Sequence, residues 1–506
     1  MKILDCTLRD GGYYTDWDFS REVVDVYFKS MNMLPMDYVE IGYRQNVSNG
    51  YVGQYGYSPL STIERVREVC GKKMSVMINE KNTTREDAEH LLSPLIGLVD
   101  MVRIAVAPEN VSRAMCVAKS VKDMGFEVGF NVMYMSKWKH VEGFYDRIKQ
   151  LSDCLDVFYM VDSYGSVTKQ DVNKAIAVLQ SILKCKIGFH GHNNLQLALS
   201  NTIEAMSCGV DIVDCSVMGM GRGAGNLNTE LLLTYLNREG LTVDFTRLSD
   251  VITAFQPLCE KYQWGTQLPY MIAGAYSLPQ KEVMELVTNR IYSFESVVHG
   301  LCDKIDYKHN RQYKTLMKDD FCSAVIIGGG KSVEDHFDAI KSFINKQRRV
   351  VLVFASARYA LMFKDIHVHK YYCLVGQEAK RLMRLLPEKF EGVCVLPPAP
   401  RRLGSEVPEF AQNDTYELHQ ISFTKHFHDS CTAVAIQTAC EICKGELFVV
   451  GYDGYSLTDG TDKEVSLMSE NGKLFNDYSS FSGRKLKSLT KTLYVELEKQ
   501  SVYQYL

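Results

Sequence analysis

Eight short apolar runs recur through the first 235 residues of this chain, alternating with segments that have apolar residues at helical spacing. Parallel strands need such crossovers, and the runs carry no hairpin turns between them. The alternation therefore predicts an α/β fold with an N-terminal (β/α)8 barrel, while an open doubly wound sheet is the competing arrangement. The predicted strands are residues 3–8, 38–43, 74–78, 101–106, 127–133, 157–161, 186–190 and 212–216.

The pattern changes after the last of these runs. Residues 240 to about 318 have mostly helical spacing, with a break at Leu268-Pro269, and the charged stretch 303–320 has the composition of a linker. A second α/β pattern follows. We therefore expect a TIM-barrel catalytic domain over 1–239, a helical extension and linker over 240–318, and a Rossmann-like domain over 319–506.

The C-terminal part carries a glycine-rich turn. The run VIIGGGKS, residues 325–332, predicts a strand, a glycine turn and a helix, an arrangement that can approach a phosphate. It matches neither a P-loop nor G-x-G-x-x-G, so alone it is a weak indication. A later strand ends near Asp453, where an acid can contact a ribose, a sugar or a metal. Further strands are expected at 350–354 and 447–450, with an irregular segment at 397–408.

Composition narrows the class of protein. The chain of 506 residues is 46% hydrophobic and 23% charged, with a net charge of −4, which is typical of soluble globular proteins and gives no indication of a nucleic-acid surface. No apolar run reaches about 18 residues, and the N-terminus lacks a signal-peptide pattern. The 15 cysteines are scattered, and the pair Cys440 and Cys443 has no second pair at zinc spacing. We expect a cytoplasmic protein with reduced thiols and no membrane or nucleic-acid partner.

Polar residues stand at the carboxyl ends of the predicted strands, where barrels of this type place their sites. They include the pair Arg9 and Asp10 after the first strand. The others are Glu40, Arg103, Asp162, Ser163, His190, His192 and the loop Gly219–Asn226. Of these, Arg103 is interpreted as a buried polar tie, and Glu40 as an acid that orients the site.

The two histidines of HGH, residues 190–192, indicate a metal site. Side chains two apart on a strand share a face, so both imidazoles can point into the barrel mouth. With the carboxylate of Asp10 they form a three-ligand set that suits Mn²⁺, Fe²⁺, Mg²⁺ or Zn²⁺. The alternative is a turn whose histidines are solvated.

Several motifs, in order, resemble one family. They are LDCTLRDGG (4–12), VEIG (39–42), VRIA (102–105), the long run GFHGHNN to GRGAGN (188–226) and AGAYS (273–277). Together they are similar to the 4-hydroxy-2-oxovalerate aldolases, which belong to the HMG-CoA-lyase-like metal-dependent aldolases and acyl synthases. The resemblance covers roughly residues 1 to 280.

The resemblance implies roles for individual residues. A divalent metal, Mn²⁺ first and Mg²⁺ or Co²⁺ as alternatives, would be held by Asp10, His190 and His192. Asn226 would be a further ligand or an amide beside the ligands. Arg9 would stabilise an enolate and, with Asp10 and Glu40, complete the family's Asp–Arg–Glu set. The residues implied in substrate binding are Arg9, Asp10, Ser163, His190 and Tyr276.

The chain departs from the family at the general base, since Tyr13 stands where the aldolases carry a histidine. A tyrosine has a pKa near 10 in water and is a poor base at neutral pH. The base could be Tyr13, Tyr14, His140 or a metal-bound water, or Tyr13 could simply pack across the barrel mouth. Because of this departure, the sequence does not identify 4-hydroxy-2-oxovalerate as the substrate. The metal–enolate chemistry is still expected.

The sequence does not decide the protein partners, the roles of two arginines or the role of the C-terminal part. The family's aldehyde dehydrogenase partner is not assumed, because an unrelated domain follows the helical segment; a homo-oligomer is compatible with the sequence. Arg44 and Arg222 could hold a substrate carboxylate or phosphate, and Arg222 could equally lie in a surface loop. The C-terminal part is similar to Rossmann-like domains of sugar-modifying and pterin-pyrophosphokinase-like proteins; a structural or oligomerising domain is the alternative.

These observations lead to one main functional hypothesis. We expect a metal-dependent aldolase that joins or splits a 2-oxo acid such as pyruvate and an aldehyde, in the biosynthesis of an acid sugar or surface-polysaccharide precursor. The loop Gly-Arg-Gly-Ala-Gly (221–225) lacks the acid–arginine pair of the acyl-CoA synthases, which favours the aldolase. An acyl-CoA-dependent 2-oxo acid synthase and a non-catalytic ligand-binding protein remain alternatives.

Overall fold

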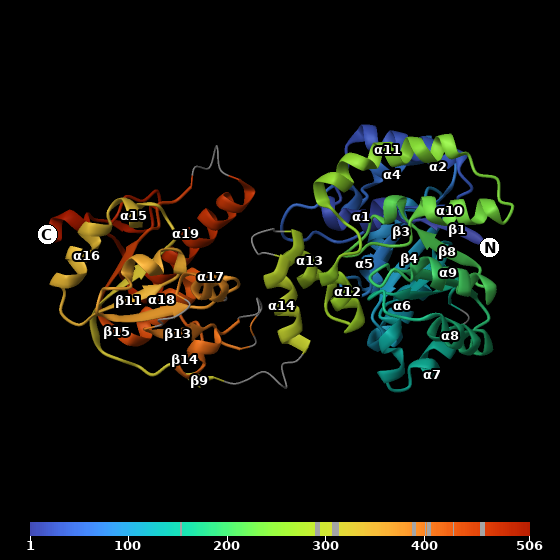
Figure 1. The fold of residues 1–506 in the computed structure, drawn as a ribbon. Helices are drawn as coiled ribbons and strands as arrows, with labels where there is room; N and C mark the ends of the chain where they lie inside the picture. Colours follow the sequence, from blue (N-terminus) through green and yellow to red (C-terminus); the bar gives the residue numbers. More distant parts are fainter. Residues whose placement is uncertain are drawn as a thin grey trace. The chain divides into compact units, whose positions relative to one another are not determined.

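The computed structural model describes residues 1–151, 154–288, 294–305, 313–386, 391–399, 401, 406–428, 430–455 and 461–506. The chain forms two compact units, Met1–Glu285 and Leu286–Leu506 (Figure 1). The division into parts at 239 and 318, made from the sequence, stays a prediction. Part of the expected linker, and part of the segment 397–408, lie outside the described residues.

The first unit is a closed barrel of eight parallel strands, coloured blue to green in Figure 1. Each strand pairs with the next in sequence, and β1 also pairs with β8, which closes the sheet. The predicted (β/α)8 barrel is confirmed, and the open sheet is excluded. The strands are β1 (Lys2–Asp5), β2 (Tyr38–Tyr43), β3 (Lys73–Asn79), β4 (Met101–Val106), β5 (Glu127–Val132), β6 (Val157–Asp162), β7 (Lys186–Gly191) and β8 (Ile212–Cys215).

Helices cover the outside of this barrel and continue beyond its last strand. The segment after residue 240 is helical as expected, and its predicted break coincides with the start of a helix at Leu268 that has Pro269 in its first turn. The helices are α1 (Thr7–Thr15), α2 (Arg21–Met33), α3 (Gln54–Tyr57), α4 (Leu60–Val69), α5 (Arg85–Leu92), α6 (Val111–Asp123), α7 (Phe144–Lys149), α8 (Lys169–Ile182), α9 (Ala198–Ser207), α10 (Thr229–Arg238), α11 (Phe245–Tyr262), α12 (Leu268–Ala275) and α13 (Gln280–Thr288).

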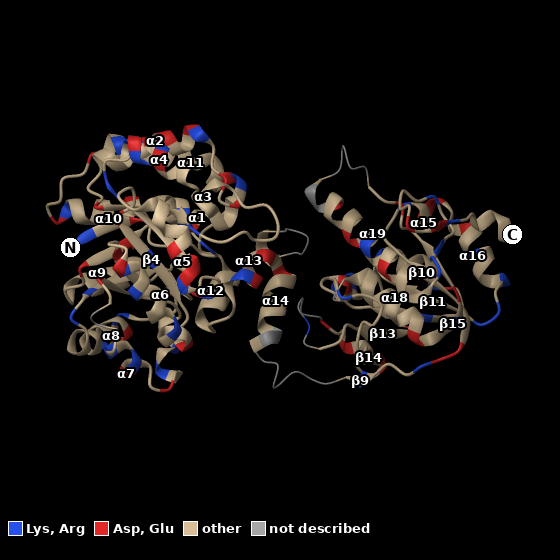
Figure 2. Cartoon of the chain, turned by 180° about the vertical axis from the view of Figure 1, so that it is seen from behind, with Lys and Arg blue, Asp and Glu red and all other residues tan. Residues whose placement is uncertain are grey.

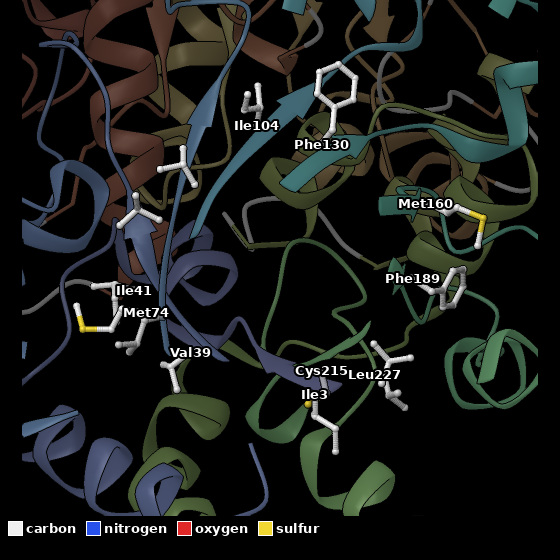
Figure 3. Packing of buried hydrophobic residues seen from close by; sticks show 14 of the residues in the cluster. Ile3, Val39, Ile41, Met74, Ile104, Phe130, Met160, Phe189, Cys215 and Leu227 are labelled. Atoms are coloured by element: carbon white, nitrogen blue, oxygen red, sulfur yellow. The ribbon is translucent and has the colours of Figure 1, made fainter. Parts of the chain in front are cut away.

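Alternate residues of each strand face opposite sides of the barrel wall. On β4, Val102 and Ile104 belong to the large apolar cluster that packs under the helices, whereas Met101 and Arg103 are buried on the other face. The barrel interior is therefore a packed core with a polar layer above it. Figure 3 shows part of the outer cluster, with Ile3, Val39, Ile41, Met74, Ile104, Phe130, Met160, Phe189, Cys215 and Leu227 labelled.

The first strand is shorter than predicted. The sequence predicts a strand over 3–8, but β1 ends at Asp5 and helix α1 begins at Thr7. The carboxylate of Asp5 accepts hydrogen bonds from the backbone N–H of Thr7 at 2.9 Å and from its hydroxyl at 2.5 Å, which satisfies donors of the first helical turn. Arg9 and Asp10 consequently lie on a helix at the barrel mouth.

Two glycines allow this helix to pack closely. A Cβ atom on Gly11 would lie 2.6 Å from Sδ of Met220, and one on Gly12 would lie 2.0 Å from the indole ring of Trp17. Both distances are too short for a side chain unless Met220 or Trp17 moves. The Gly-Gly pair after Arg9 and Asp10 therefore serves close packing of α1 against the rest of the barrel mouth.

The second unit contains a nine-stranded parallel sheet in the order β17-β16-β15-β10-β11-β12-β13-β14-β9. The chain runs from β10 through β11 to one side and returns to build β15, β16 and β17 on the other. The parallel α/β fold is confirmed, while the Rossmann-like assignment stays a prediction. The strands are β9 (Lys314–Thr315), β10 (Phe321–Ile327), β11 (Val350–Phe354), β12 (His369–Cys373), β13 (Val393–Leu396), β14 (Thr415–Glu417), β15 (Cys443–Val450), β16 (Lys487–Ser488) and β17 (Glu498–Lys499).

Helices of the second unit are α14 (Phe294–Ile305), α15 (Ser332–Asp335), α16 (Phe337–Lys346), α17 (Glu378–Leu385), α18 (Cys431–Ile442) and α19 (Asp462–Ser482). Figure 2 shows basic and acidic residues interspersed along the helices of both units, in agreement with the small net charge of −4. Within the described ranges, none of the helices combines the length and the apolar character that a membrane crossing requires.

Candidate active site

A cavity of about 50 Å³ opens at the carboxyl ends of the barrel strands, where enzymes with this fold place their sites. It has room for a few heavy atoms of a ligand, whose remaining atoms would extend through its open side. Six of the sequence-predicted residues line it, together with the arginine of the loop after β8. The lining residues are Arg9, Asp10, Tyr13, Tyr43, Met77, Ala105, Asn131, Met133, Val161, Ser163, His190, His192 and Arg222.

Asp10, His190 and His192 converge in this cavity. One ligand atom from each lies within 4.8 Å of the others. Nε2 of His190 is 3.3 Å from Nε2 of His192 and 3.5 Å from Oδ2 of Asp10. All three side chains are buried. Two imidazole nitrogens and a carboxylate oxygen at such distances are the donor set of a divalent metal site with open positions.

The protonation of the histidines fits this role. Nδ1 of His190 lies 2.9 Å from Oδ2 of Asp214 and must carry the proton of that hydrogen bond, because the carboxylate is ionised. Nε2 of His190 therefore faces Asp10 and His192. Burial lowers the pKa of His192 to about 3, and His190 adds to this effect, so His192 is neutral and has a free lone pair.

Asp10 is held as a carboxylate. Burial alone would raise its pKa, but Arg9 and His190 outweigh burial and hold the pKa well below its usual range. Burial alone would lower the pKa of His190, but its hydrogen bonds to the carboxylates of Asp10 and Asp214, together with their negative charges, raise it. Without a metal, a proton on His190 would balance the charge that a cation would otherwise neutralise.

Asn226 lies beside the candidate metal ligands, and its role as a ligand stays a prediction. Its Nδ2 donates to Oδ2 of Asp10 at 2.7 Å, and its Oδ1 is buried with no hydrogen-bond partner among the described residues. Nδ1 of His192 is likewise buried without such a partner. An unpaired buried acceptor such as Oδ1 of Asn226 is costly, and a cation beside it would remove part of that cost. The donor set therefore fits a divalent cation.

Arg9 is fixed by two carboxylates. Its Nη1 is 2.5 Å from Oδ1 of Asp10, and its Nε is 2.8 Å from Oε2 of Glu40. Glu40 is fully buried and lies outside the residues that line the cavity. It thus contacts the cavity-lining residue Arg9 and not the cavity itself.

Arg103 continues this network across the barrel interior. Its Nη1 is 3.2 Å from Oε2 of Glu40, its Nη2 pairs with Asp214, and its guanidinium carbon lies 4.1 Å from the centre of the Tyr159 ring. The sequence predicted Arg103 as a buried polar residue that links parts of the barrel, and in the structure it is buried and paired with Glu40 and Asp214. Six buried side chains form a closed ring of contacts: Asp10, Arg9, Glu40, Arg103, Asp214 and His190.

Tyr13 lies on α1 and reaches the cavity. Its hydroxyl is 3.0 Å from the hydroxyl of Tyr43 at the end of β2, and the guanidinium carbon of Arg222 lies 5.4 Å from the centre of its ring. Burial raises the pKa of Tyr43 well above its usual range, and Tyr13 adds to that shift. Tyr13 is therefore the tyrosine of α1 that can contact a ligand.

The other candidates for a base lie elsewhere. Tyr14 donates its hydroxyl to the carbonyl oxygen of Gly223 at 2.8 Å, and burial raises its pKa well above the usual range. His140 ends the 3₁₀ helix Met135–His140 and lines a different hollow, on the outer side of the barrel beside α8. Neither side chain is among those that line the cavity at the barrel mouth.

Ser163 follows β6 and lines the cavity, where its Oγ accepts the backbone N–H of Tyr134 at 2.9 Å. The structure does not bring Tyr276 to the cavity: it caps α12, is 58% exposed and is not a lining residue. Arg44 also lies outside and donates to the carbonyl oxygen of Leu91 at 2.8 Å.

Sequence reasoning missed three residues of this site: Tyr43, Asn131 and Asp214. Asn131 lines the cavity, and its Oδ1 accepts from Nε of Arg103 at 3.2 Å. A pattern was available for both Asn131 and Asp214. Asp214 is the single charged residue of β8, and Asn131 interrupts the apolar residues that follow Glu127 in β5. Buried polar residues at such positions need partners, and those partners form the site.

The second unit has a cavity of about 480 Å³ at the carboxyl ends of β10 and β15, lined in part by the glycine turn Gly328–Gly330 and by Asp453. Oδ2 of Asp453 accepts the backbone N–H of Ser332 at 2.9 Å. A Cβ atom on Gly330 would lie 2.6 Å from the carboxyl carbon of Asp453. The chain's own carboxylate thus occupies the approach that the glycine turn offers to a phosphate. A ligand role for Asp453 stays a prediction.

Comparisons with known proteins identify relatives of the barrel. The family profile described as HMGL-like matches residues 99–254. The 4-hydroxy-2-oxovalerate aldolase of Pelotomaculum thermopropionicum is 30% identical over 287 residues, covering 55% of this chain and 83% of that protein. The protein of the same name from Geobacillus thermodenitrificans is 33% identical over 265 residues, covering 49% of this chain and 73% of that protein.

A solved structure covers a similar share of the chain. The crystal structure of the N-terminal domain of a candidate aldolase from Bacteroides vulgatus is 55% identical and covers 59% of this chain and 99% of that chain, with a TM-score of 0.56. The likeness thus extends over most of the length of each of these relatives. The chain belongs to the 4-hydroxy-2-oxovalerate aldolase family of HMGL-like enzymes, and it is a carbon–carbon lyase.

Proposed function

We propose that this enzyme makes or breaks the carbon–carbon bond between the enolate of a pyruvate-like 2-oxo acid and an aldehyde. One observation carries the proposal: Asp10, His190, His192 and Arg9 converge in a small cavity at the barrel mouth. The carboxylate of Asp10 and the imidazoles of the two histidines suit a divalent cation, for which we propose Mn²⁺, with Mg²⁺ or Co²⁺ as alternatives. Such a cation would stabilise negative charge on the oxygens of the 2-oxo acid.

Arg9 contributes a fixed positive charge. Because Asp10 and Glu40 hold its guanidinium from two sides, the group needs no reorganisation when an enolate oxygen gains charge beside it. The hydroxyl of Ser163, whose oxygen accepts the N–H of Tyr134, is oriented to donate to the carboxylate of the 2-oxo acid.

Tyr13 is the group that we assign to proton transfer with the aldehyde oxygen. In the condensing direction a bond forms between C3 of the enolate and the aldehyde carbon, and the aldehyde oxygen takes up a proton. A tyrosine hydroxyl is protonated at neutral pH and can donate this proton directly. In the cleaving direction the same oxygen takes the proton back from the hydroxyl of the aldol, as microscopic reversibility requires. Tyr13 is therefore proposed as the proton-transfer group in both directions.

The finer proposal concerns the product. A condensation of pyruvate with an aldehyde sugar yields a 2-oxo-3-deoxy acid sugar, and we propose a precursor of a surface polysaccharide as the product class. The second α/β unit, with its separate cavity of about 480 Å³, supports a substrate context beyond short aldehydes. Turnover with acetaldehyde alone, and none with aldoses of three to six carbons, would contradict this part.

Proton exchange on pyruvate tests the enolate chemistry. The enzyme, Mn²⁺ and pyruvate are incubated in D₂O, and the methyl signal is followed by NMR. We expect the signal to disappear with the wild-type enzyme, and to persist after chelation or in Asp10→Ala. Asp123→Ala, which removes an exposed carboxylate from α6, is the matched control and should exchange as wild type. Exchange that continues without metal, or in Asp10→Ala, would sink the proposal.

A further inference from the structure

We propose that Arg222 forms an anion subsite in the barrel cavity, and that this subsite holds a carboxylate or phosphate group of the acceptor aldehyde. The inference rests on the proposed aldolase function and specifies the class of its second substrate. Its starting point is the pairing of the buried cations. Among the described residues, Arg222 forms no ion pair, and its Nε is buried without a hydrogen-bond partner.

The neighbouring cations are different in this respect. Arg9 is paired with Asp10 and Glu40, and Arg103 with Glu40 and Asp214. Every one of the three carboxylates in the ring of contacts already has an arginine partner. The charge of Arg222 is therefore not needed to neutralise any of them, and it remains available to a ligand.

The loop that carries Arg222 is held in place. Gly223 and Gly225 have φ values of +67° and +80°, which favour glycine, and the hydroxyl of Tyr14 donates to the carbonyl oxygen of Gly223 at 2.8 Å. The guanidinium carbon of Arg222 lies 5.4 Å from the centre of the Tyr13 ring. A half-buried guanidinium held against an aromatic ring is an ordered binding group, unlike a mobile surface arginine.

Its place in the cavity points to the acceptor. The oxygens of the 2-oxo acid are assigned to other groups in the proposed function: to Arg9, to Ser163 and to the metal held by Asp10, His190 and His192. Arg222 instead lies beside Tyr13, which is assigned to the aldehyde oxygen. An anionic group on the acceptor, close to its reacting carbon, would reach Arg222 while the aldehyde oxygen faces Tyr13. The bidentate geometry of a guanidinium suits carboxylate and phosphate alike.

Acceptor specificity tests this subsite. The acceptors are acetaldehyde and glyceraldehyde as neutral compounds, glyoxylate and succinic semialdehyde for the carboxylate, and glyceraldehyde 3-phosphate for the phosphate. We expect the wild type to prefer one anionic class. In Arg222→Gln we expect KM for that class to rise roughly ten- to a hundredfold, the effect of losing one charged hydrogen-bonding partner. Arg222→Lys should recover part of the loss.

Two controls separate this inference from the proposed function. Metal-dependent pyruvate exchange, measured without an acceptor, should be unchanged in Arg222→Gln, and Arg238→Gln, which alters an exposed arginine on α10, should leave all acceptors unaffected. Loss of exchange in Arg222→Gln would overturn the inference, since Arg222 would then hold the donor. Equal use of neutral and anionic acceptors by the wild type would also overturn it, while the aldolase function would stand.

A failure of the proposed function gives a different result. If the wild type exchanges no pyruvate, calorimetric titration with propionate and with glycerol 3-phosphate still reports on the subsite. Binding of one anion that is lost in Arg222→Gln would support an anion subsite without the aldolase. No difference in binding between wild type and Arg222→Gln would overturn the subsite.

Discussion

Nδ1 of His190 on β7 lies 2.9 Å from Oδ2 of Asp214 on the neighbouring strand β8. The contact fixes which nitrogen of His190 carries a proton and leaves Nε2 directed at Asp10 and His192. Asp214 also pairs with Arg103, so the orientation of a candidate metal ligand depends on an ion-pair network that crosses the barrel. This dependence gives the first prediction.

Asp214→Asn should weaken metal binding without removing a ligand. An asparagine can offer an N–H to Nδ1 of His190, which would favour the wrong tautomer and place a proton on Nε2. Losses of this kind are typically ten- to a hundredfold in metal affinity. Calorimetric titration with Mn²⁺ measures the change, and Asp156→Asn, at a partly exposed carboxylate that pairs with Lys122, is the control. Equal Mn²⁺ affinity in wild type and Asp214→Asn would contradict the positioning role.

Arg103→Met should destabilise the barrel strongly. Arg103 is fully buried between the carboxylates of Glu40 and Asp214, and its removal leaves both without that partner. Breaking a buried pair in this way costs about 3–5 kcal/mol of the free energy of unfolding. Urea unfolding measures the loss. Arg85→Met, at an arginine that is 60% exposed and pairs with Glu89, itself 47% exposed, should cost no more than about 1 kcal/mol; similar losses in the two variants would refute the argument.

Gly12→Ala tests the packing of α1. The added Cβ atom would lie 2.0 Å from the indole ring of Trp17, so helix or ring must move. Overpacking of this kind costs about 1–3 kcal/mol, and the movement should also disturb Arg9 and Asp10 on the same helix. We expect a lower midpoint of urea unfolding together with weaker Mn²⁺ binding. Gly71→Ala, whose Cβ has 3.4 Å to its nearest neighbour, is the matched control and should change neither quantity.

Asp162 should make stability depend on pH. Burial raises the pKa of this carboxyl to about 7, although backbone N–H groups of Ser166 and Val167 oppose the shift. Its unfolded value is near 4. Because the folded pKa is the higher one, the contribution to stability is complete below about pH 4 and is lost as pH rises to about 7. Asp162→Asn should remove this part of the pH dependence.

The comparison uses urea unfolding between pH 4 and pH 8. The stability of Asp162→Asn relative to wild type should rise over this range, whereas Asp123→Asn, at an exposed position on α6, should follow the wild type in parallel. Parallel curves for wild type and Asp162→Asn would show that the backbone donors keep the carboxylate ionised.

Much of this fold was predictable because its signals are local. The alternation of apolar runs and helical spacing predicted the barrel. The two-residue spacing of His190 and His192 at the end of a strand predicted that both imidazoles lie on the same face, and their Nε2 atoms are 3.3 Å apart. The extent of β1 was not predictable in this way. Its end depends on Asp5, whose carboxylate is held by Tyr27 and Thr229, residues far away in sequence.

The parts of the site that were missed depend on tertiary contacts. Asp214 matters because it meets His190 and Arg103, and Tyr43 because it meets Tyr13; neither partner is near in sequence. Tyr276 was assigned from a motif, and the structure leaves it exposed at the end of α12. The substrate-binding role of Tyr276 stays a prediction, because a motif gives the type of a residue and not the position of its side chain.

Tyr13→Phe separates the two halves of the proposed reaction. The variant keeps the ring beside Arg222 but loses the hydroxyl that lies 3.0 Å from the hydroxyl of Tyr43. Enolate formation does not need proton donation to an aldehyde, so pyruvate exchange should stay within about twofold of wild type. Condensation needs it, and general acid catalysis is typically worth about 10²–10⁴-fold in rate. The rate of condensation should therefore fall by that factor.

Tyr14→Phe is the matched comparison, because Tyr14 lies on the same helix and outside the cavity. It should retain condensation, apart from a modest effect of the lost hydrogen bond to Gly223. Pyruvate exchange followed by NMR and condensation followed by loss of the aldehyde give the two rates for each variant. If Tyr13→Phe slows both rates equally, Tyr13 acts on the 2-oxo acid itself; if it slows neither, the proton for the aldehyde oxygen comes from another group in the cavity.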